Sequence, residues 1–422
     1  MATLVARPRR LGPAFDLLAN YRPGGFFFER AGIGVSAVGM AERIGVEGGP
    51  ERLSILAREA QTVLRDIRVQ GGGSPPIAVG AIPFDAGWPA HLVVPERTAI
   101  RRSPGATEQL DVFPEGFAPL NPERERWTGR ALPHDAFEDM HLRPDPEPEE
   151  YAHAVREATR RIRAGRLRKV VLARSIVVAA DRALDPKQLL WRLRAVDPDC
   201  WTFATPELAL DAGTLVPTGV LVGATPELLV AKRGAEVRST PLAGSAPRFG
   251  DPEADRASAR GLFGSAKDRE EHALVVEDVA EALRPLCEDL RFPHEPELLG
   301  TANVWHLATP FRGTLRSEVR TALDLVAALH PTPAVCGTPR DTARSVLADL
   351  EPLDRGCYAG PVGWVDAGGD GEWAIALRCA EITGTTARVF AGAGIVADSD
   401  PERELDETDR KFRALLDSLR WG

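Results

Sequence analysis

Strand-like segments follow one another in pairs along this 422-residue chain, and that pairing constrains the fold more than any other feature. The stretches GGFFFERAGIGVSAVG and PPIAVGAIPFDAGWPAHLVVPE read as strands that are cut by glycine and proline. RKVVLARSIVVAA and GVLVGATPELLVAKRG also predict strands, and RGCYAGPVGWVDAGGDGEWAIALRCAEI predicts a hairpin. Strands do not alternate regularly with helices, so the pattern favours an α+β fold over a doubly wound parallel sheet.

Helical segments lie between these strands. PERLSILAREAQTVLRDIRV has apolar residues at helical spacing, and KDREEHALVVEDVAEALRPL predicts a long helix. A further helix is predicted over Glu149–Arg163, which opens with prolines and acids and ends with arginines, as the helix dipole favours. Proline and charge dominate Phe113–Glu150, which predicts a surface connection.

Charge and cysteine content exclude several classes of protein. A net charge of −9 argues against a nucleic-acid or anionic-membrane partner. No apolar run approaches the roughly 20 residues of a membrane span, and the N-terminus has no signal-like run. An odd number of cysteines without CxxC spacing fits neither a disulfide framework nor a zinc site, and favours the reducing cytoplasm. These cysteines are Cys200, Cys287, Cys336, Cys357 and Cys379.

The acid-rich stretch ADSDPERELDETDRKF near the C-terminus is a candidate metal site. Read as a helix, it places Glu404, Glu407 and Lys411 on one face. Two like charges three residues apart destabilise a helix unless a cation offsets them, and Mg²⁺ takes carboxylate oxygens. The alternative is a solvated helix face, which is the usual fate of a charge run.

Two further charged residues have both a structural and a functional interpretation. Glu271 in KDREEH is either a helix-start acid or a ligand, and the adjacent His272 is expected to be structural. Lys169 precedes an apolar strand, where a lysine commonly extends to water. It could instead act as a general base if burial or the neighbouring arginines lowered its pKa.

Arg378 is predicted to lie in a nearly apolar strand, WAIALRCAEI, where its guanidinium needs an anionic partner. That partner is either an internal acid or a substrate carboxylate. Gly392 and Gly394 in FAGAGIV, and the segment PLAGS, either bring backbone N–H groups near an anion or form simple turns.

The pentapeptide ATPEL occurs twice, so two glutamates compete for one role. Glu207 belongs to the first copy and Glu227 to the second. Two copies of five residues do not predict a repeat architecture.

Ten segments, taken in order, resemble the chorismate-utilising enzymes and among them most closely the isochorismate synthases. The resemblance spans about Glu149 to Leu419 and implies one large α+β domain of the α/β sandwich type, with two large, mainly antiparallel sheets flanked by helices. Residues 1–148 would complete the sheet scaffold, and residues 149–419 would bind chorismate and carry catalysis. The segments are KVVLAR, GATPELLV, STPLAGSAPR, KDREEH, NVWHLATPFRG, LHPTPAVCGTP, RGCYAGPVGW, ALRCAEI, AGAGIV and PERELDETDRKF.

The same resemblance implies a mechanism. Lys169 would activate a water that attacks C2 of chorismate, and Glu227 would protonate the departing C4 hydroxyl. Only Glu227 has the glycine that precedes the family's motif, so Glu207 is predicted to be a loop acid. We expect burial to raise the pKa of Glu227, because a proton donor must hold its proton.

Further site residues are carried over from the motifs. Those expected to hold Mg²⁺ are Glu271, Glu404 and Glu407. Those expected to contact substrate are Gly244, Ser245, His306, Tyr358, Arg378, Gly392 and Lys411.

The resemblance also limits partners and alternatives. Chorismate is the expected small-molecule substrate, with no nucleic acid, no membrane and no glutaminase subunit, and the chain is expected to be a monomeric cytoplasmic isomerase. The product implies siderophore or menaquinone biosynthesis. A salicylate synthase, which adds pyruvate elimination, and a non-catalytic chorismate-binding protein are the alternatives. Cys336 stands where many relatives have another small residue, which leaves fine specificity open.

Overall fold

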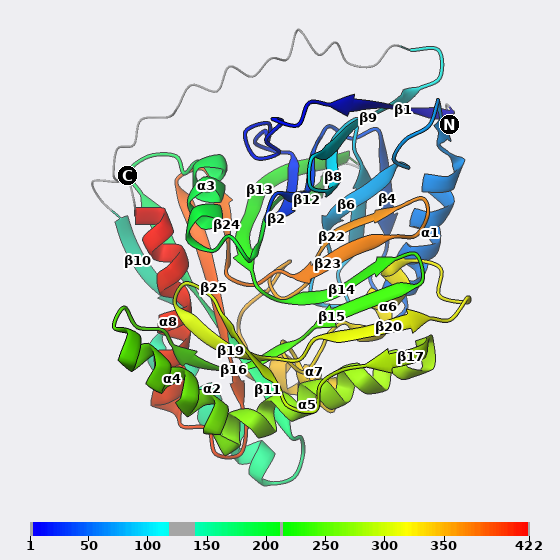
Figure 1. Cartoon of the computed structure of the whole chain (residues 1–422). Helices are drawn as coiled ribbons and strands as arrows, with labels where there is room; N and C mark the ends of the chain where they lie inside the picture. The colour runs from blue at the N-terminus through cyan, green and yellow to red at the C-terminus, as the bar shows by residue number, and fades with distance from the viewer. Residues whose placement is uncertain (1–2, 118–139, 212–213, 421–422) are drawn as a thin grey trace.

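Two extended sheets organise the computed structural model, which describes residues 3–117, 140–211 and 214–420 (Figure 1). Within these residues every strand pair is antiparallel except β1 with β5. The larger, 13-stranded sheet runs β10 (Met140–Asp145), β11 (Lys169–Ala180), β25 (Thr386–Ile395), β24 (Cys379–Thr383), β13 (Thr214–Thr225), β12 (Trp201–Asp211), β2 (Phe26–Arg30), β3 (Ile33–Val38), β8 (Arg97–Ser103), β9 (Ala106–Pro114), β1 (Leu4–Leu11) and β5 (Arg68–Val69), with β21 (Gly337–Thr338) beside β11.

The second sheet has nine strands and a third has three. The nine-stranded sheet runs β17 (Cys287–Arg291), β20 (Phe311–Leu315), β15 (Glu236–Thr240), β14 (Leu228–Arg233), β23 (Gly371–Ile375), β22 (Pro361–Asp366), β6 (Ile77–Ala81), β7 (Ala90–Val94) and β4 (Glu42–Val46). The small sheet consists of β16 (Leu242–Pro247), β19 (Val304–Ala308) and β18 (Glu297–Gly300).

Helices cover the sheets from outside. α8 (Pro401–Arg420) and α3 (Pro186–Val196) pack on the outer face of the large sheet, beside β25 and β13, in a core of their own. α1 (Arg52–Asp66) and α6 (Ala322–Leu329) belong to the main core together with both sheets. The remaining helices are α2 (Pro148–Arg163), α4 (Pro252–Gly264), α5 (Ala266–Leu283) and α7 (Arg340–Leu350), with a 3₁₀ turn at Arg284–Leu286.

This architecture confirms the α+β fold with two mainly antiparallel sheets that the sequence predicts. The predicted hairpin is formed by β22 and β23, and the helix predicted over Glu149–Arg163 is α2. Strands from both sides of residue 148 contribute to both large sheets. None of the helices in the described ranges has the length and apolar character needed to cross a membrane.

One predicted connection is partly wrong. Met140–Asp145, inside the segment expected to be a surface connection, forms the edge strand β10 and pairs with β11 along its whole length. An edge strand tolerates proline and charge because one side of its backbone needs no partner. Residues 118–139 of the same segment lie outside the described ranges.

Candidate active site

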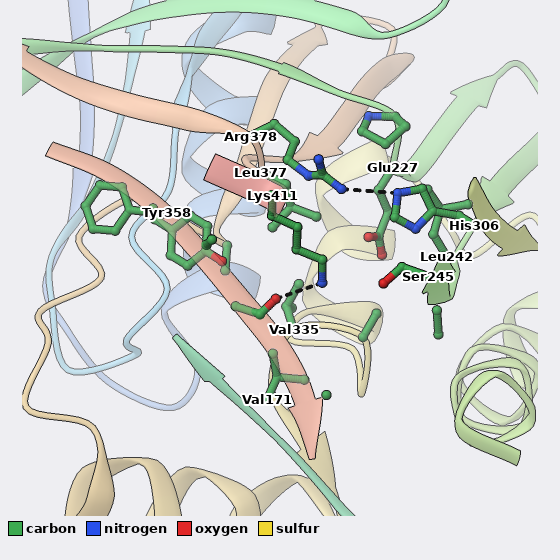
Figure 2. A pocket seen from close by; sticks show the side chains of 18 of the residues that line it. Val171, Glu227, Leu242, Ser245, His306, Val335, Tyr358, Leu377, Arg378 and Lys411 are labelled. Carbon is green, nitrogen blue, oxygen red and sulfur yellow. Dashed lines mark hydrogen bonds between the residues drawn. The ribbon is translucent and has the colours of Figure 1, made fainter. Parts of the chain in front are cut away.

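A cavity opens between the large sheet and the small sheet, and it gathers most of the predicted site residues. β11 and β25 form one wall, while β16 and α5 contribute the opposite side (Figure 2). Three predicted residues, Lys169, Glu404 and Glu407, do not line it. Nine do: Glu227, Gly244, Ser245, Glu271, His306, Tyr358, Arg378, Gly392 and Lys411.

Glu227 is the buried acid of the cavity. It sits in the short connection between β13 and β14 with 3% of its surface exposed. Burial raises the pKa of Glu227 to about 8, although Lys169, Lys411 and a backbone hydrogen bond from Leu242 pull it down. The carboxyl group therefore keeps its proton near neutral pH, in the direction expected for a proton donor.

Arg378 does not lie in a strand, contrary to the expectation from its apolar neighbours. It occupies a bend between β23 and β24, with φ at 49°, where the chain passes from the nine-stranded sheet to the large one. The crossing turns its side chain into the cavity (Figure 2). Within the described residues Arg378 forms no ion pair with an acid, which favours a ligand carboxylate over an internal salt bridge as its partner.

His306 holds the Arg378 guanidinium in place. The Arg378 Nη2 group donates to His306 Nε2 over 3.3 Å, and His306 Nδ1 lies 3.3 Å from the carbonyl oxygen of Gly244 (Figure 2). Burial and the nearby guanidinium lower the pKa of His306 to about 3, so the ring is neutral. These partners assign the ring proton to Nδ1, which leaves Nε2 as the acceptor.

Each predicted metal acid is paired with a lysine. Glu271 Oε1 lies 3.0 Å from the Lys169 Nζ atom, and Lys169 is fully buried at the start of β11. Both acids of α8 are paired in the same way. Glu404 Oε1 accepts from Lys267 over 2.8 Å, and Glu407 Oε1 accepts from Lys411 over 2.6 Å.

The local folds explain why these charges meet. Ser265 caps α5 by accepting from the N–H of Asp268, so Lys267 and Glu271 lie in the first two turns of that helix. The α8 helix begins at Pro401, so Glu404 and Glu407 lie in its first two turns. The predicted helical face of Glu404, Glu407 and Lys411 is therefore confirmed.

The two acids of α8 differ in their electrostatics. Burial and the neighbouring charge of Glu407 raise the pKa of Glu404. Burial acts in the same direction on Glu407, but the ammonium of Lys411 and a hydrogen bond from Ser245 lower its pKa below the ordinary value. Glu407 is thus the firmly ionised member of the pair.

Two glycines of β25 make room for the site. A Cβ atom at Gly394 would lie 2.2 Å from Glu271 Oε1 and 3.0 Å from Lys169 Cε, so a side chain there would displace that ion pair. At Gly392 a Cβ atom would lie 3.1 Å from the Tyr358 hydroxyl. The Gly392 carbonyl also accepts a hydrogen bond of 2.8 Å from Lys411. Close approach of side chains explains both glycines better than a turn does, since both lie within the strand.

Donor atoms and neighbours show whether these acids suit Mg²⁺. Glu271, Glu404 and Glu407 offer carboxylate oxygens, the donor type that Mg²⁺ takes in proteins. As they stand, each carboxylate faces a lysine, and across the described residues no three His, Cys, Asp or Glu side chains are grouped as a metal site. The donor chemistry fits Mg²⁺, while one oxygen of each acid is paired with a lysine ammonium.

Glu207 was predicted to be a loop acid, and this is wrong. It lies in β12, directly opposite Gly219 of β13, and its carboxyl group shares a hydrogen bond with Glu381 of β24. Burial raises the pKa of both carboxyl groups. Glu207 lines a second cavity between β3 and β7, away from Glu227, so the two copies of ATPEL have separate surroundings.

Sequence reasoning missed two cationic residues at the site. Arg355 lines the cavity, forms two hydrogen bonds to Glu351 and donates to the carbonyl of Val335. Lys267 pairs with Glu404 as described above. Both stand inside or beside segments that resemble the family, but neither is flanked by an apolar run that would have set it apart. All five cysteines are free, as the count predicts.

This chain is similar to known proteins over most of its length. The model of a family described as chorismate binding enzyme matches residues 121–420. Isochorismate synthase DhbC of Bacillus subtilis strain 168 is 41% identical over 406 residues, which cover 96% of each chain. Isochorismate synthase EntC of Escherichia coli strain K12 is 36% identical over 401 residues, which cover 94% of this chain and 95% of EntC.

A solved structure has the same fold. The crystal structure of DhbC from Bacillus anthracis superposes with a TM-score of 0.81 at 36% sequence identity. The match covers 96% of this chain and 98% of that one.

Proposed function

This chain belongs to the chorismate-binding enzyme family, and from that premise we propose that it is an isochorismate synthase, an isomerase that converts chorismate reversibly to isochorismate. One observation carries the proposal: Glu227, a buried acid that keeps its proton, shares a cavity with the cationic side chains of Arg378 and Lys411. A substrate with two carboxylates that must lose a hydroxyl group needs both features.

Substrate binding is assigned to the cationic side chains. The Arg378 guanidinium has a planar fork that suits a carboxylate, and His306 fixes the orientation of that fork. Lys411 of α8 offers its ammonium to the same cavity, where it also donates to the Gly392 carbonyl (Figure 2). Tyr358, whose ring stacks on Phe390 at 4.9 Å, closes the side next to Gly392. Ser245 and Gly244 of β16 supply a hydroxyl and backbone contacts.

The chemical step is a hydroxyl exchange with two proton transfers. Lys169 removes a proton from the water that attacks C2, and Glu227 gives its proton to the hydroxyl that leaves C4 as water. Water is a poor nucleophile and hydroxide a poor leaving group, so both ends need a proton carrier. One C–O bond forms and one breaks, which makes the reaction reversible.

Lys169 can act as a base only as a neutral amine. In the structure its Nζ atom faces the Glu271 carboxylate at 3.0 Å, and a charged ammonium there cannot accept a proton. The base role therefore requires that Glu271 give up this contact when substrate binds.

We assign Glu271, Glu404 and Glu407 as the acids that would hold Mg²⁺. When bound, the ion would neutralise and orient a substrate carboxylate. The proposal extends to a place in siderophore or menaquinone biosynthesis, to action without a glutaminase subunit as a monomer, and to the cytoplasm, where five free cysteines stay reduced.

The test is to incubate purified protein with chorismate and Mg²⁺ and to separate the products by chromatography with mass detection. A new product isobaric with chorismate, reaching the same ratio from chorismate and from isochorismate, is the expected result. Salicylate with an equal amount of pyruvate would instead identify a salicylate synthase. Bound chorismate without turnover would identify a non-catalytic binding protein.

A further inference from the structure

Lys267 is a charged residue at the site to which the proposed mechanism gives no role. It lies one turn before Glu271 on α5, and its ammonium donates to Glu404 over 2.8 Å. Burial lowers the pKa of Lys267, but the carboxylates of Glu404, Glu271 and Glu407 together raise it above the ordinary value. Lys267 therefore lies within the field of all three predicted metal acids.

Charge balance explains why a cation is needed at this position. The carboxylates of Glu404 and Glu407 repel each other, and Glu404 has only 2% of its side chain exposed, so water offsets little of its charge. The three lysines supply three positive charges in the absence of any other cation. Without Lys267, Glu404 would be a buried acid next to a second acid.

The lysines differ in how easily they can leave. The side chains of Lys169 and Lys411 are 1% and 17% exposed, and both have roles in the proposed reaction. Lys267 is 35% exposed, so its ammonium can swing into water on its flexible stem. Among these three lysines, Lys267 should therefore need the least free energy to move away from its carboxylate.

We propose that Lys267 is an exchangeable counter-ion: it neutralises Glu404 while the acids hold no metal, and a divalent cation that binds the acids displaces it. This inference rests on the proposed metal site. As a consequence, Lys267 competes with Mg²⁺ and weakens metal binding by the substrate-free protein. While no metal is bound, the lysine reduces the repulsion between Glu404 and Glu407.

The test is isothermal titration of the substrate-free full chain with MgCl₂. Lys267→Met removes the ammonium and keeps the stem, and it should bind Mg²⁺ about three- to tenfold more tightly than the wild type. Lys267→Arg keeps the charge and should show no such gain. Lys232→Met is the matched control, since Lys232 of β14 pairs with Asp370 at 3.1 Å, is 7% exposed and does not line the cavity.

A second measurement detects the counter-ion role directly. In EDTA, Lys267→Met should unfold at a lower temperature than the wild type, and saturating Mg²⁺ should narrow that gap. Mg²⁺ affinity that is equal or weaker in Lys267→Met, or no binding by either protein, would overturn the inference. Chorismate turnover by the same preparations keeps this outcome separate from failure of the proposed function, because the titration contains no substrate.

Discussion

Replacing Glu227 with glutamine should remove the pH dependence that this one carboxyl group imposes on the free energy of unfolding. Burial raises the pKa of Glu227 from 4.5 to about 8. Between these two pH values the folded protein keeps a proton that the unfolded chain releases. The contribution of Glu227 to the free energy of unfolding is therefore greatest below pH 4.5, and it is lost as the pH rises toward 8. Glutamine has nearly the same shape and cannot ionise.

The size of the effect follows from the width of that interval. One bound proton changes the free energy of unfolding by about 1.4 kcal/mol per pH unit. Between pH 4.5 and about 8, ionisation of Glu227 lowers the free energy of unfolding of the wild type by up to about 5 kcal/mol. The variant does not undergo this loss. Glu227 is 3% exposed, so solvent does little to screen this cost.

Denaturant unfolding of both proteins at pH 5, 6, 7 and 8 measures this effect. The contributions of all other groups cancel in the difference between the two curves. That difference should move in favour of Glu227→Gln by about 1.4 kcal/mol per pH unit. A difference that stays flat from pH 5 to 8 would mean that Glu227 ionises like an exposed acid, and the assignment of Glu227 as the proton donor would then be abandoned.

Three further substitutions test the site. Lys169→Ala should abolish turnover while chorismate still binds by calorimetry; normal turnover would remove Lys169 as the base. Glu207→Gln should change kcat less than about twofold, because Glu207 lines a different cavity; an inactive variant would show that the wrong ATPEL copy was chosen. Gly394→Ala should lower kcat at least about tenfold at unchanged fold by circular dichroism, since its Cβ atom would meet Glu271 at 2.2 Å; wild-type kinetics would show that the Lys169–Glu271 contact is dispensable.

Local signals in the sequence were sufficient for most of the helices and strands, whereas the resemblance to the family supplied most of the cavity residues. The α8 acids and Lys411 share a face because helical spacing alone decides it. The motif comparison then brought together residues as distant as Glu227 and Lys411, which no periodicity connects.

Long-range geometry explains what the sequence did not reveal. Arg378 looked like a strand residue because its neighbours are apolar, yet those neighbours are buried where the chain crosses between two sheets. Glu207 looked like a loop acid because nothing in ATPEL indicates that Glu381, which lies 174 residues later, shares a hydrogen bond with it. The pairing of Lys267 with Glu404 joins two helices across a separation of 137 residues.

Both large sheets are completed by strands from the two ends of the chain, and this has a consequence for how the protein can be made and cut. β12 pairs with β2, β11 pairs with β10, and β22 pairs with β6, so residues before 148 cover two strand edges in the large sheet and one in the nine-stranded sheet. A polypeptide limited to residues 149–419 would carry every proposed catalytic residue and yet expose three unpaired strand edges, at β11, β12 and β22, which can pair with other chains. Such a fragment should aggregate. In the full chain, β2 and β6 can pair with β12 and β22 only after these much later strands have been synthesised, which predicts slow folding.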